Sequence, residues 1–307
     1  ALSGADVLPF LQGLVSNDVL PLAKGPGLVW AALLTPQGKY LADFFVVNTG
    51  AARLLDIKDT VAAATVQRLS MYRLRADVQI NPTDLAVTRG LGEAPAGALP
   101  DPRHADLGWR AYGAHGTAPL IDWDALRVAH IIPETGIELI ADDSYLLESG
   151  FERLHGVDFR KGCYVGQEVT ARMKHKTELR KGLVRVQIDG AAPVGTEIVT
   201  EDGKPAGTVF TQRGGRAIAH LRLDRADGPL RAGDAVQALA AELPAAMAKT
   251  IPRAAAARTA SSSNWLAPPP KLMLATAGKM AFAATQSTPL MTEVVVPEPL
   301  QSSTFTP

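Results

Sequence analysis

Cysteine is almost absent from the sequence, since Cys163 is the only one among 307 residues. A lone thiol excludes an internal disulfide, and it cannot form a multi-cysteine zinc or iron–sulfur site by itself. Such sparing use of cysteine agrees with a reducing compartment. The first residues, ALSGADVLPFLQG, also lack the basic start and long apolar stretch of a secretory signal. We therefore expect a cytoplasmic protein, with the mitochondrial matrix as the alternative.

An excess of charge of one sign and long apolar runs are missing as well. Lys plus Arg and Asp plus Glu each number 31, so the net charge gives no reason to expect nucleic acid or a membrane as a partner. No apolar run approaches the ~20 residues that span a bilayer. With 47% hydrophobic and 20% charged residues, the composition is that of a globular protein. A chain of this length predicts two or three structural units.

Helix and strand patterns alternate through the first half of the chain. The spacing of apolar residues predicts a short helix that starts near Ser3. Two apolar runs joined by Thr-Pro-Gln-Gly at 35–38 predict a hairpin over residues 27–47. Further along, the patterns predict a helix at 59–74, a strand at 75–80, a loop with a short strand at 94–120, and a helix at 123–132 that Pro133 closes.

The pattern after residue 178 is all-β. Its apolar runs are short and rich in β-branched residues, and Asp-Gly at 202–203 and Gly-Gly at 214–215 predict tight turns between them. We therefore predict a small barrel or sandwich over residues 179–244. Residues 245–307 hold eight prolines and one glycine and show no sustained period. That composition predicts a disordered tail.

The single cysteine lies in RKGCYVGQEVTAR, residues 160–172. Its glycines match neither a P-loop nor a dinucleotide-binding turn, but glycine permits close backbone approach and unusual dihedral angles. The amide of Gln167 and the carboxylate of Glu168 suit the amino-pyrimidinone edge of a heterocycle. The surrounding lysines and arginines favour a thiolate. Taken alone, these residues leave open a buried, inert cysteine beside a solvated Gln-Glu pair.

Residues 161–168, KGCYVGQE, closely resemble the K-G-C-[YF]-x-G-Q-E signature of the YgfZ family. Members of that family are folate-binding proteins that assist iron–sulfur enzymes and are related in fold to the glycine-cleavage T-protein. The stretches SGADVLPFLQGLVSNDV, TPQGKYLADFF and YRLRADVQI are similar to the family too, as is the whole of residues 146–172. The resemblance covers residues 1 to about 244.

The resemblance implies an α+β fold of the T-protein type, a ring of three units around a central folate channel. Two interleaved mixed α/β units would come from residues 1–178, and a C-terminal β-barrel from residues 179–244, with the tail at 245–307 outside the ring. Cys163 is the family's signature thiol and the implied catalytic residue. The implied cofactor-binding residues are Asn17, Asp18, Asp43, Lys161, Tyr164, Gln167, Glu168 and Arg172. If its segment is helical, Arg172 would face Glu168 and could pair with it.

Two departures argue against aminomethyl transfer. T-protein relatives carry a pair of aspartates after the hairpin, where this chain has Ala42 and Asp43. They also carry an acid and a glycine in an Arg-x-Glu-x-Gly segment, where this chain has Ala129 and Ile131. Carboxylates are needed to orient the folate and handle its amine. Losing two of them weakens the expectation of a working transferase.

The six histidines are scattered without the spacing of metal ligands, so a metal site within the chain alone is not expected. They are His104, His115, His130, His155, His175 and His220. A transient iron–sulfur cluster shared with a partner, with Cys163 as one ligand, stays open.

The expected function is that of a tetrahydrofolate-binding accessory factor for assembly or repair of iron–sulfur proteins. Its partners would be cluster assembly factors or client enzymes, with neither nucleic acid nor a membrane among them. Two alternatives stay open, a folate-dependent aminomethyl- or methyltransferase and a non-catalytic folate-binding scaffold. Since fold analogy supports all three equally, the chemistry of the site has to separate them.

Overall fold

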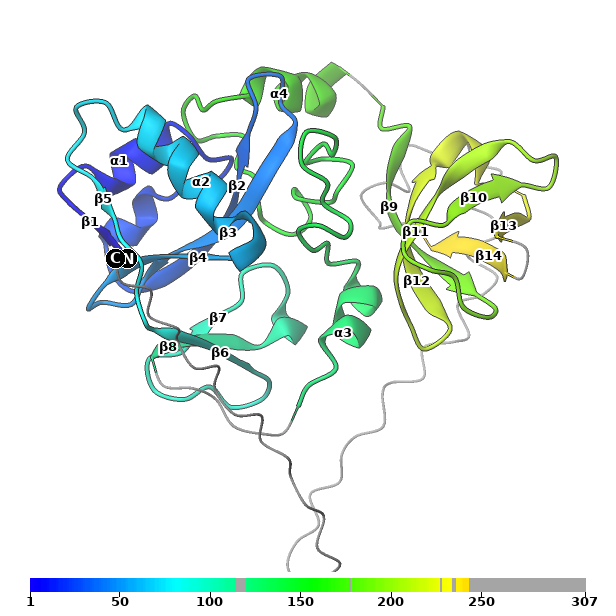
Figure 1. Cartoon of the computed structure of the whole chain (residues 1–307), viewed down its shortest axis with the longest axis horizontal. Coiled ribbons are helices and arrows are strands. Elements are labelled where there is room, and N and C mark those ends of the chain that lie inside the picture. Colours follow the sequence, from blue (N-terminus) through cyan, green and yellow to red (C-terminus); the bar gives the residue numbers. More distant parts are fainter. Residues whose placement is uncertain (114–119, 177, 227, 234–235, 243–307) are drawn as a thin grey trace, which may run out of the picture. The chain divides into compact units, whose positions relative to one another are not determined.

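The structure is a computed structural model that describes residues 1–113, 120–176, 178–226, 228–233 and 236–242. All of these lie in one compact unit that spans residues 1–264 (Figure 1). The predicted tail at 245–307 lies outside the described residues. Among the helices of the described part, none is both long and apolar enough to cross a membrane.

A five-stranded sheet forms the centre of the N-terminal part (Figure 1). In spatial order its strands are β2 (Gly27–Leu34), β3 (Tyr40–Asn48), β4 (Arg53–Ile57), β1 (Leu2–Ser3) and β5 (Gln79–Ile80). The strand period of two sends alternate side chains of β2 to opposite faces. Trp30 belongs to one apolar core and Ala31 to the other. The sheet is therefore buried on both faces, which explains its nearly continuous apolar sequence.

Two helices cover one of these faces, α1 (Val7–Gln12) and α2 (Asp59–Tyr72). Leu11 of α1 and Leu69 of α2 are fully buried in the core that they share with the sheet. The helix predicted to start near Ser3 begins instead at Val7, because Leu2 and Ser3 pair with β5. The predicted strand at 75–80 was wrong in extent, since only Gln79 and Ile80 reach a pairing partner.

The predicted hairpin is confirmed, since β2 and β3 pair antiparallel. The Thr35 N–H donates to the carbonyl of Lys39 at 2.8 Å, and the Gly38 N–H donates to the carbonyl of Thr35 at 2.9 Å. Gly38 has a φ of 76°, a conformation that glycine adopts without steric cost. The turn residues thus place the hairpin tip, against which the cysteine-bearing segment packs.

A smaller sheet has the order β6 (Ala86–Gly90), β8 (Trp109–Gly113) and β7 (Leu99–Pro100). Buried charge ties it to the larger sheet, because Arg110 pairs with Asp56 of β4 at 2.6 Å. The helix α3 (Trp123–His130) follows, and it ends two residues before the predicted boundary. Its end is set by Ile131, whose left-handed backbone, with a φ of 53°, cannot continue a right-handed helix.

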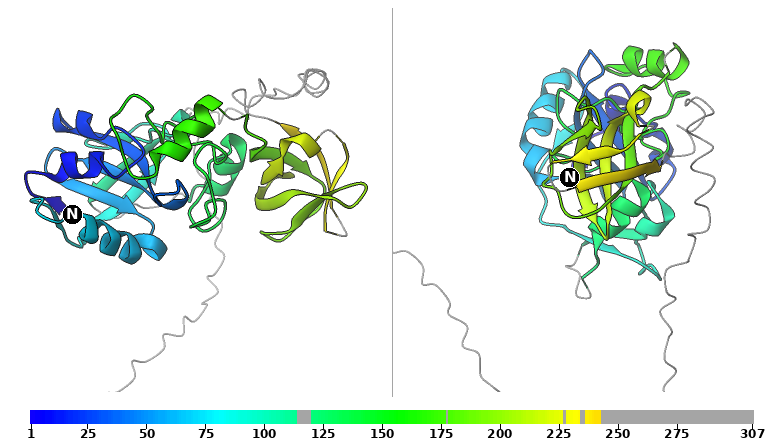
Figure 2. Two further views of the ribbon diagram at one scale, coloured as in Figure 1. Left: turned by 90° about the horizontal axis from the view of Figure 1, so that it is seen from above. Right: turned by 90° about the vertical axis from the view of Figure 1, so that its right-hand side faces the viewer.

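The C-terminal part is a closed barrel, which settles the choice between barrel and sandwich (Figure 2). Its strands are β9 (Lys181–Ile188), β10 (Glu197–Thr200), β11 (Pro205–Arg213), β12 (Arg216–Arg222), β13 (Leu230–Ala232) and β14 (Val236–Glu242). Val128 and Ile131 pack with Leu183 and Ile218 of the barrel in a small apolar cluster. The α+β class with a C-terminal β-barrel is confirmed.

Within the described ranges, the elements not yet named are one helix and three 3-10 turns. The helix is α4 (Gln167–Lys176), and the turns are η1 (Leu20–Ala23), η2 (Ala105–Leu107) and η3 (Leu223–Arg225). The position of α4 matters for function because it begins four residues after Cys163.

Candidate functional site

Cys163 is exposed, so the alternative of a buried cysteine is wrong. The residue lies in a loop that leads directly into α4. The side-chain oxygen of Gln167, the first residue of α4, accepts a hydrogen bond from the Tyr164 N–H at 2.9 Å. The amide nitrogen of Gln167 then lies 3.9 Å from the Cys163 Sγ. One side chain therefore closes the loop and presents a donor to the thiol.

Residues 161–166, which we call the cysteine loop, are held in place by Lys161. Its ammonium group donates to the carbonyl oxygens of Gln12 and Val15, each at 2.6 Å. Burial lowers the pKa of Lys161 to about 8, against the opposing effect of Asp18, Asp158 and Cys163. Lys161 is thus a half-buried cation close to the thiol, and two of its donors are used by the backbone.

Close packing of glycines holds the same loop against the hairpin. Gly166 has a φ of 82°, and a Cβ added there would lie 2.3 Å from the carbonyl oxygen of Thr35. A Cβ added to Gly38 would meet Val169 at 2.8 Å. By contrast, nothing lies within 4 Å of the Cβ position of Gly162. The close approach expected from the glycines is therefore made by Gly166, toward the protein's own backbone.

Asn17 and Asp18 are hydrogen-bonded to the backbone of the protein. The Asn17 amide donates to the carbonyl of Trp30 at 2.8 Å and to that of His155 at 2.6 Å. The Asp18 carboxylate accepts from the Leu20 N–H at 3.1 Å. Both donors of the Asn17 amide are occupied, which leaves its oxygen, already bonded to the Asp18 N–H, as its remaining polar atom.

Asp43 lies at the centre of a second group of polar side chains. Its carboxylate accepts from the Trp30 indole N–H at 2.8 Å, from the Tyr40 hydroxyl at 2.7 Å, and from the Thr135 hydroxyl. Burial, together with the charge of Asp43, raises the pKa of Tyr40 well above its usual range. Most of the acceptor capacity of Asp43 is therefore used inside the protein.

The exposed face of α4 carries the remaining expected site residues. Glu168 and Arg172 are both exposed, and within the described residues neither has a hydrogen bond or ion pair with the other or with a third residue. The segment is helical, which meets the condition for a Glu168–Arg172 ion pair, but the described residues do not form that pair. Such an exposed pair contributes little stability, so solvent competes with it effectively.

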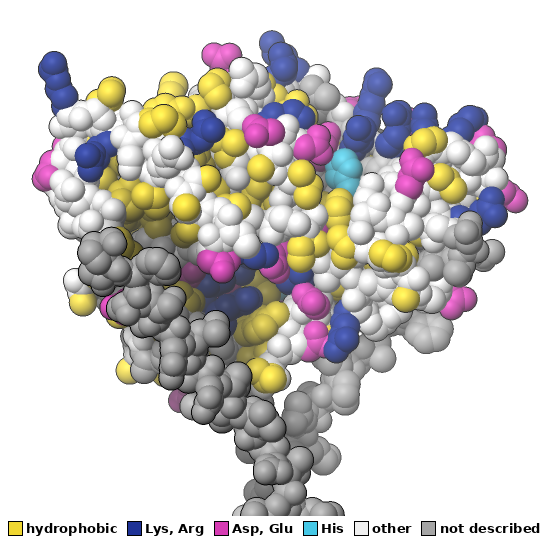
Figure 3. All heavy atoms as spheres, viewed as in Figure 1, with side chains coloured by type: hydrophobic (Ala, Val, Ile, Leu, Met, Phe, Trp, Pro, Cys, Tyr) yellow, Lys and Arg dark blue, Asp and Glu magenta, His cyan; other side chains and the backbone are white. Residues whose placement is uncertain are grey.

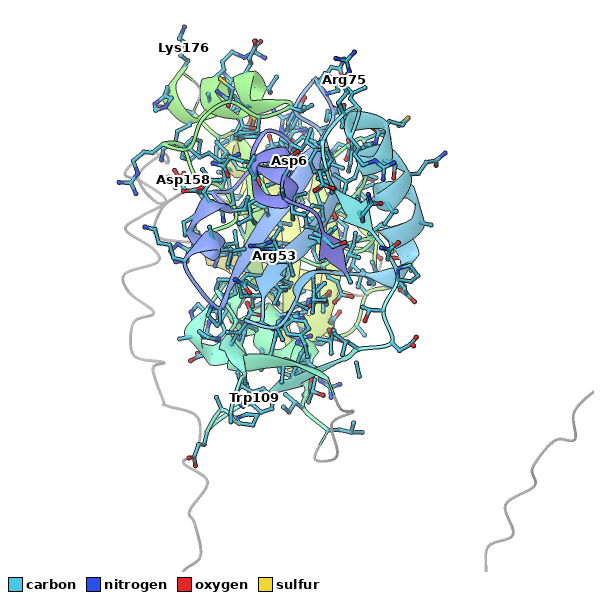
Figure 4. The ribbon with its side chains drawn as sticks, turned by 90° about the vertical axis from the view of Figure 1, so that its left-hand side faces the viewer. Asp6, Arg53, Arg75, Trp109, Asp158 and Lys176 are labelled. Atoms are coloured by element: carbon cyan, nitrogen blue, oxygen red, sulfur yellow. The ribbon has the colours of Figure 1, made fainter. Side chains whose placement is uncertain are left out.

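Basic residues dominate the last turn of α4, with Lys174, His175 and Lys176 in succession. Lys174 pairs with Glu152. Figure 4 shows Lys176 at the C-terminal end of α4, with its side chain pointing away from the rest of the protein. Asp158 lies on the same side, below it in this view. Lys and Arg side chains project along the upper edge of Figure 3, the edge where Figure 1 places α4. The surface next to the cysteine loop is thus polar and mainly basic.

Tyr164 is oriented inward. It is partly buried against the core of Trp30 and Phe151, and burial raises its pKa to about 12. The sequence analysis missed Trp30, Tyr40 and Thr135, which surround Asp43. Thr135 lies 92 residues from Asp43 along the chain, and no local pattern marks such a partner.

The fold and the site define a protein of the aminomethyltransferase fold with an exposed cysteine loop. The solved structure of aminomethyltransferase T of the glycine cleavage system from Bartonella henselae matches with a TM-score of 0.55 and 12% sequence identity. The match covers 79% of this chain and 82% of that one. At this identity the likeness shows the fold alone.

Sequence relatives define the family. Iron-sulfur cluster assembly factor IBA57 of Homo sapiens is 31% identical, over 78% of this chain and 80% of its own length. The Mus musculus protein of that name is also 31% identical, over 74% and 76% respectively. The family model for the CAF17 C-terminal beta-barrel domain matches residues 180–249. The chain therefore belongs to the IBA57/CAF17 family.

The relatives refine two expectations. They carry the name IBA57, so the family is stated at that level rather than as YgfZ. They are also named mitochondrial, which agrees with the alternative location and lends no support to the cytoplasm.

A homologue from Mycosarcoma maydis is 33% identical, and the match spans 60% of this chain and 53% of that relative.

Proposed function

We propose that this protein acts in the assembly of iron–sulfur clusters, with Cys163 as the residue that takes part directly. The observation that carries the proposal is an exposed, single thiol held in a loop by Gln167 and Lys161. Membership in a family whose relatives are named iron–sulfur cluster assembly factors supports it. A structural cysteine would be buried, and this one is not.

Cys163 would supply one thiolate ligand to a cluster in transit. Clusters are held mainly by several cysteine thiolates, and this chain has one cysteine. The other ligands must therefore come from a second protein, an assembly factor or the client enzyme. The basic end of α4 beside the loop would favour an acidic surface on that partner.

Tetrahydrofolate is the proposed cofactor, and it would supply one-carbon carrier chemistry when bound. The residues inferred from the family resemblance fit it in part. Asn17, Lys161 and Asp43 are largely occupied by protein partners and would shape the site. Among the described residues Glu168 has an exposed carboxylate without a hydrogen-bond partner, and Gln167 has a donor that faces Cys163. These two residues would contact the amino-pyrimidinone edge, and Arg172 would lie on the same helix.

The accessory role is favoured over a transferase by the site itself. Where transferases have an acid, Ala129 offers a backbone carbonyl, and Arg185 donates to it at 2.6 Å. The paired aspartate is replaced by the buried Ala42. Neither position has a carboxylate to handle the folate amine.

Two measurements test the proposal separately. Calorimetric titration of tetrahydrofolate into the parent protein should show binding that Gln167→Ala weakens and Cys163→Ala keeps. In cells that depend on this protein, Cys163→Ala should fail to restore the activity of iron–sulfur enzymes, although the variant folds normally. Restored activity would overturn the role of Cys163 and favour a folate-binding scaffold. Absence of folate binding in the parent would overturn the cofactor and leave the cluster role standing.

A further inference from the structure

Three side chains that are potential metal ligands meet outside the cysteine loop. His104 lies before η2, Asp106 within it, and His130 at the end of α3. A ligand atom of each residue lies within 4.8 Å of those of the other two. Linear spacing could not show this group, because 24 residues separate Asp106 from His130 along the chain.

The carboxylate of Asp106 is shared by the two imidazoles. Its Oδ2 lies 2.8 Å from the His130 Nε2 and 3.9 Å from the His104 Nδ1. The imidazole rings stack, with centroids 3.9 Å apart. Ligand atoms around tetrahedral zinc lie about 3.3 Å apart, as bonds of about 2.0–2.2 Å require. The two separations from Asp106 bracket that value, and rotation of the stacked imidazoles would bring three ligands to one ion.

All three side chains are accessible to solvent. The side chain of His104 is 36% exposed, that of His130 is 23% exposed and that of Asp106 is 60% exposed. His104 Nδ1 accepts from the Asp106 N–H at 3.2 Å, and this hydrogen bond has to break before the Nδ1 lone pair can bind an ion. An ion has access from solvent, and its fourth coordination position would be open to water.

Neighbouring charges both attract and repel a cation at this cluster. The carboxylate of Asp106, which faces both imidazoles, attracts a cation. Arg153 donates to the His130 carbonyl at 2.9 Å, and its positive charge opposes a cation. Binding should therefore be weaker than in a structural zinc site.

We propose that His104, Asp106 and His130 bind one divalent transition-metal ion of the zinc type. Two imidazoles and one carboxylate match the borderline-soft character of Zn²⁺ and exclude Mg²⁺ and Ca²⁺ as preferred ions. The ion would join the η2 segment to the end of α3, next to the apolar cluster of Ile131 and the barrel. The site uses none of the residues of the cysteine loop.

The test uses the full chain with Cys163→Ser, which removes the only thiol. Calorimetry with Zn²⁺ and visible spectroscopy with Co²⁺ should show one equivalent bound, with the intense bands of four-coordinate cobalt. His130→Asn and Asp106→Asn should each weaken Zn²⁺ binding by about 100-fold or more, since even outer-shell partners are worth about 10–100-fold. His104→Asn keeps an acceptor for the Asp106 N–H and should weaken binding as strongly.

His220 provides the matched control. It faces a single carboxylate, that of Glu148 at 3.4 Å, and it is absent from the three-ligand group. His220→Asn should bind Zn²⁺ as the parent does. Thermal melts add a readout of folding. Zn²⁺ should raise the melting midpoint of the Cys163→Ser chain and leave the midpoint of the same chain with His130→Asn unchanged. Without metal, the melting curves of these two proteins should coincide. No Zn²⁺ uptake, or equal uptake by His130→Asn, would overturn the site.

Discussion

Gly166 lies directly against the carbonyl oxygen of Thr35, so that the cysteine loop and the hairpin tip touch backbone to backbone. A Cβ at position 166 would come within 2.3 Å of that oxygen, and the φ of 82° is strained for any other residue. The exposed thiol three residues earlier thus depends on a contact that only glycine permits.

Replacing Gly166 with alanine should destabilise the protein. Left-handed backbone costs an L residue about 1–2 kcal/mol, and relief of the clash with Thr35 adds to that. We expect a loss of at least about 2 kcal/mol in the free energy of unfolding, measured by denaturant titration. Gly162→Ala is the control, because its Cβ position is open, and it should change stability by less than about 0.5 kcal/mol. Equal effects of the two substitutions would contradict this role of Gly166.

Ile131 and Leu74 share a left-handed backbone, with φ of 53° and 44°, but differ in burial. Ile131 is 8% exposed and Leu74 is 90% exposed. Glycine relieves about 1–3 kcal/mol of backbone strain at either position, whereas truncating a buried isoleucine costs about 2–5 kcal/mol. Ile131→Gly should therefore lower stability by about 1–3 kcal/mol.

Leu74→Gly should be neutral or stabilising by up to about 1 kcal/mol, because no buried surface is lost and the flexibility of glycine in the unfolded chain offsets part of the relief. Denaturant titration of both variants measures the contrast. Stabilisation by Ile131→Gly would show that strain outweighs packing at the end of α3.

The pH dependence of stability should report the burial of Lys161. Its pKa falls from 10.5 to about 8 in the folded protein, so between these values the unfolded chain binds more protons. Stability contributed by this group therefore rises with pH from about 8 to 10.5. Below that window the cost of holding a half-buried cation is fully present.

Lys161→Met removes this titration. The difference in unfolding free energy between parent and variant, measured from pH 7 to 11, should shift in favour of the parent as pH rises through the window. A constant difference would show that the Lys161 ammonium is as well solvated in the folded state as in the unfolded state.

Asp43 and Glu168 should respond differently to loss of charge. Asp43→Asn presents an amide N–H₂ to a group of three donors, which should cost about 1–3 kcal/mol of stability. Glu168→Gln, on an exposed helix face, should change stability by less than about 0.5 kcal/mol while weakening tetrahydrofolate binding. Thermal melts combined with folate calorimetry measure both effects. Folate binding unchanged in Glu168→Gln would remove Glu168 from the proposed site.

Local features were predictable where a few neighbouring residues define them. The Thr-Pro-Gln-Gly turn placed the hairpin, and β-branched runs between glycine turns placed the barrel strands. The family signature drew attention to Cys163, and the structure shows it exposed. Boundaries were less accurate, as at Ile131, because its left-handed conformation comes from packing against the barrel and not from its own preference.

The sequence by itself determined the all-β character of the C-terminal part and the place of the single thiol, because periodicity and turn chemistry act over short distances. The α+β class and the barrel came from the family resemblance. Only the tertiary structure showed that Asp43 is occupied by Trp30, Tyr40 and Thr135, and that His104, Asp106 and His130 form one cluster. These contacts join residues far apart in the chain. Their geometry follows from how sheets and helices pack, which no local pattern encodes.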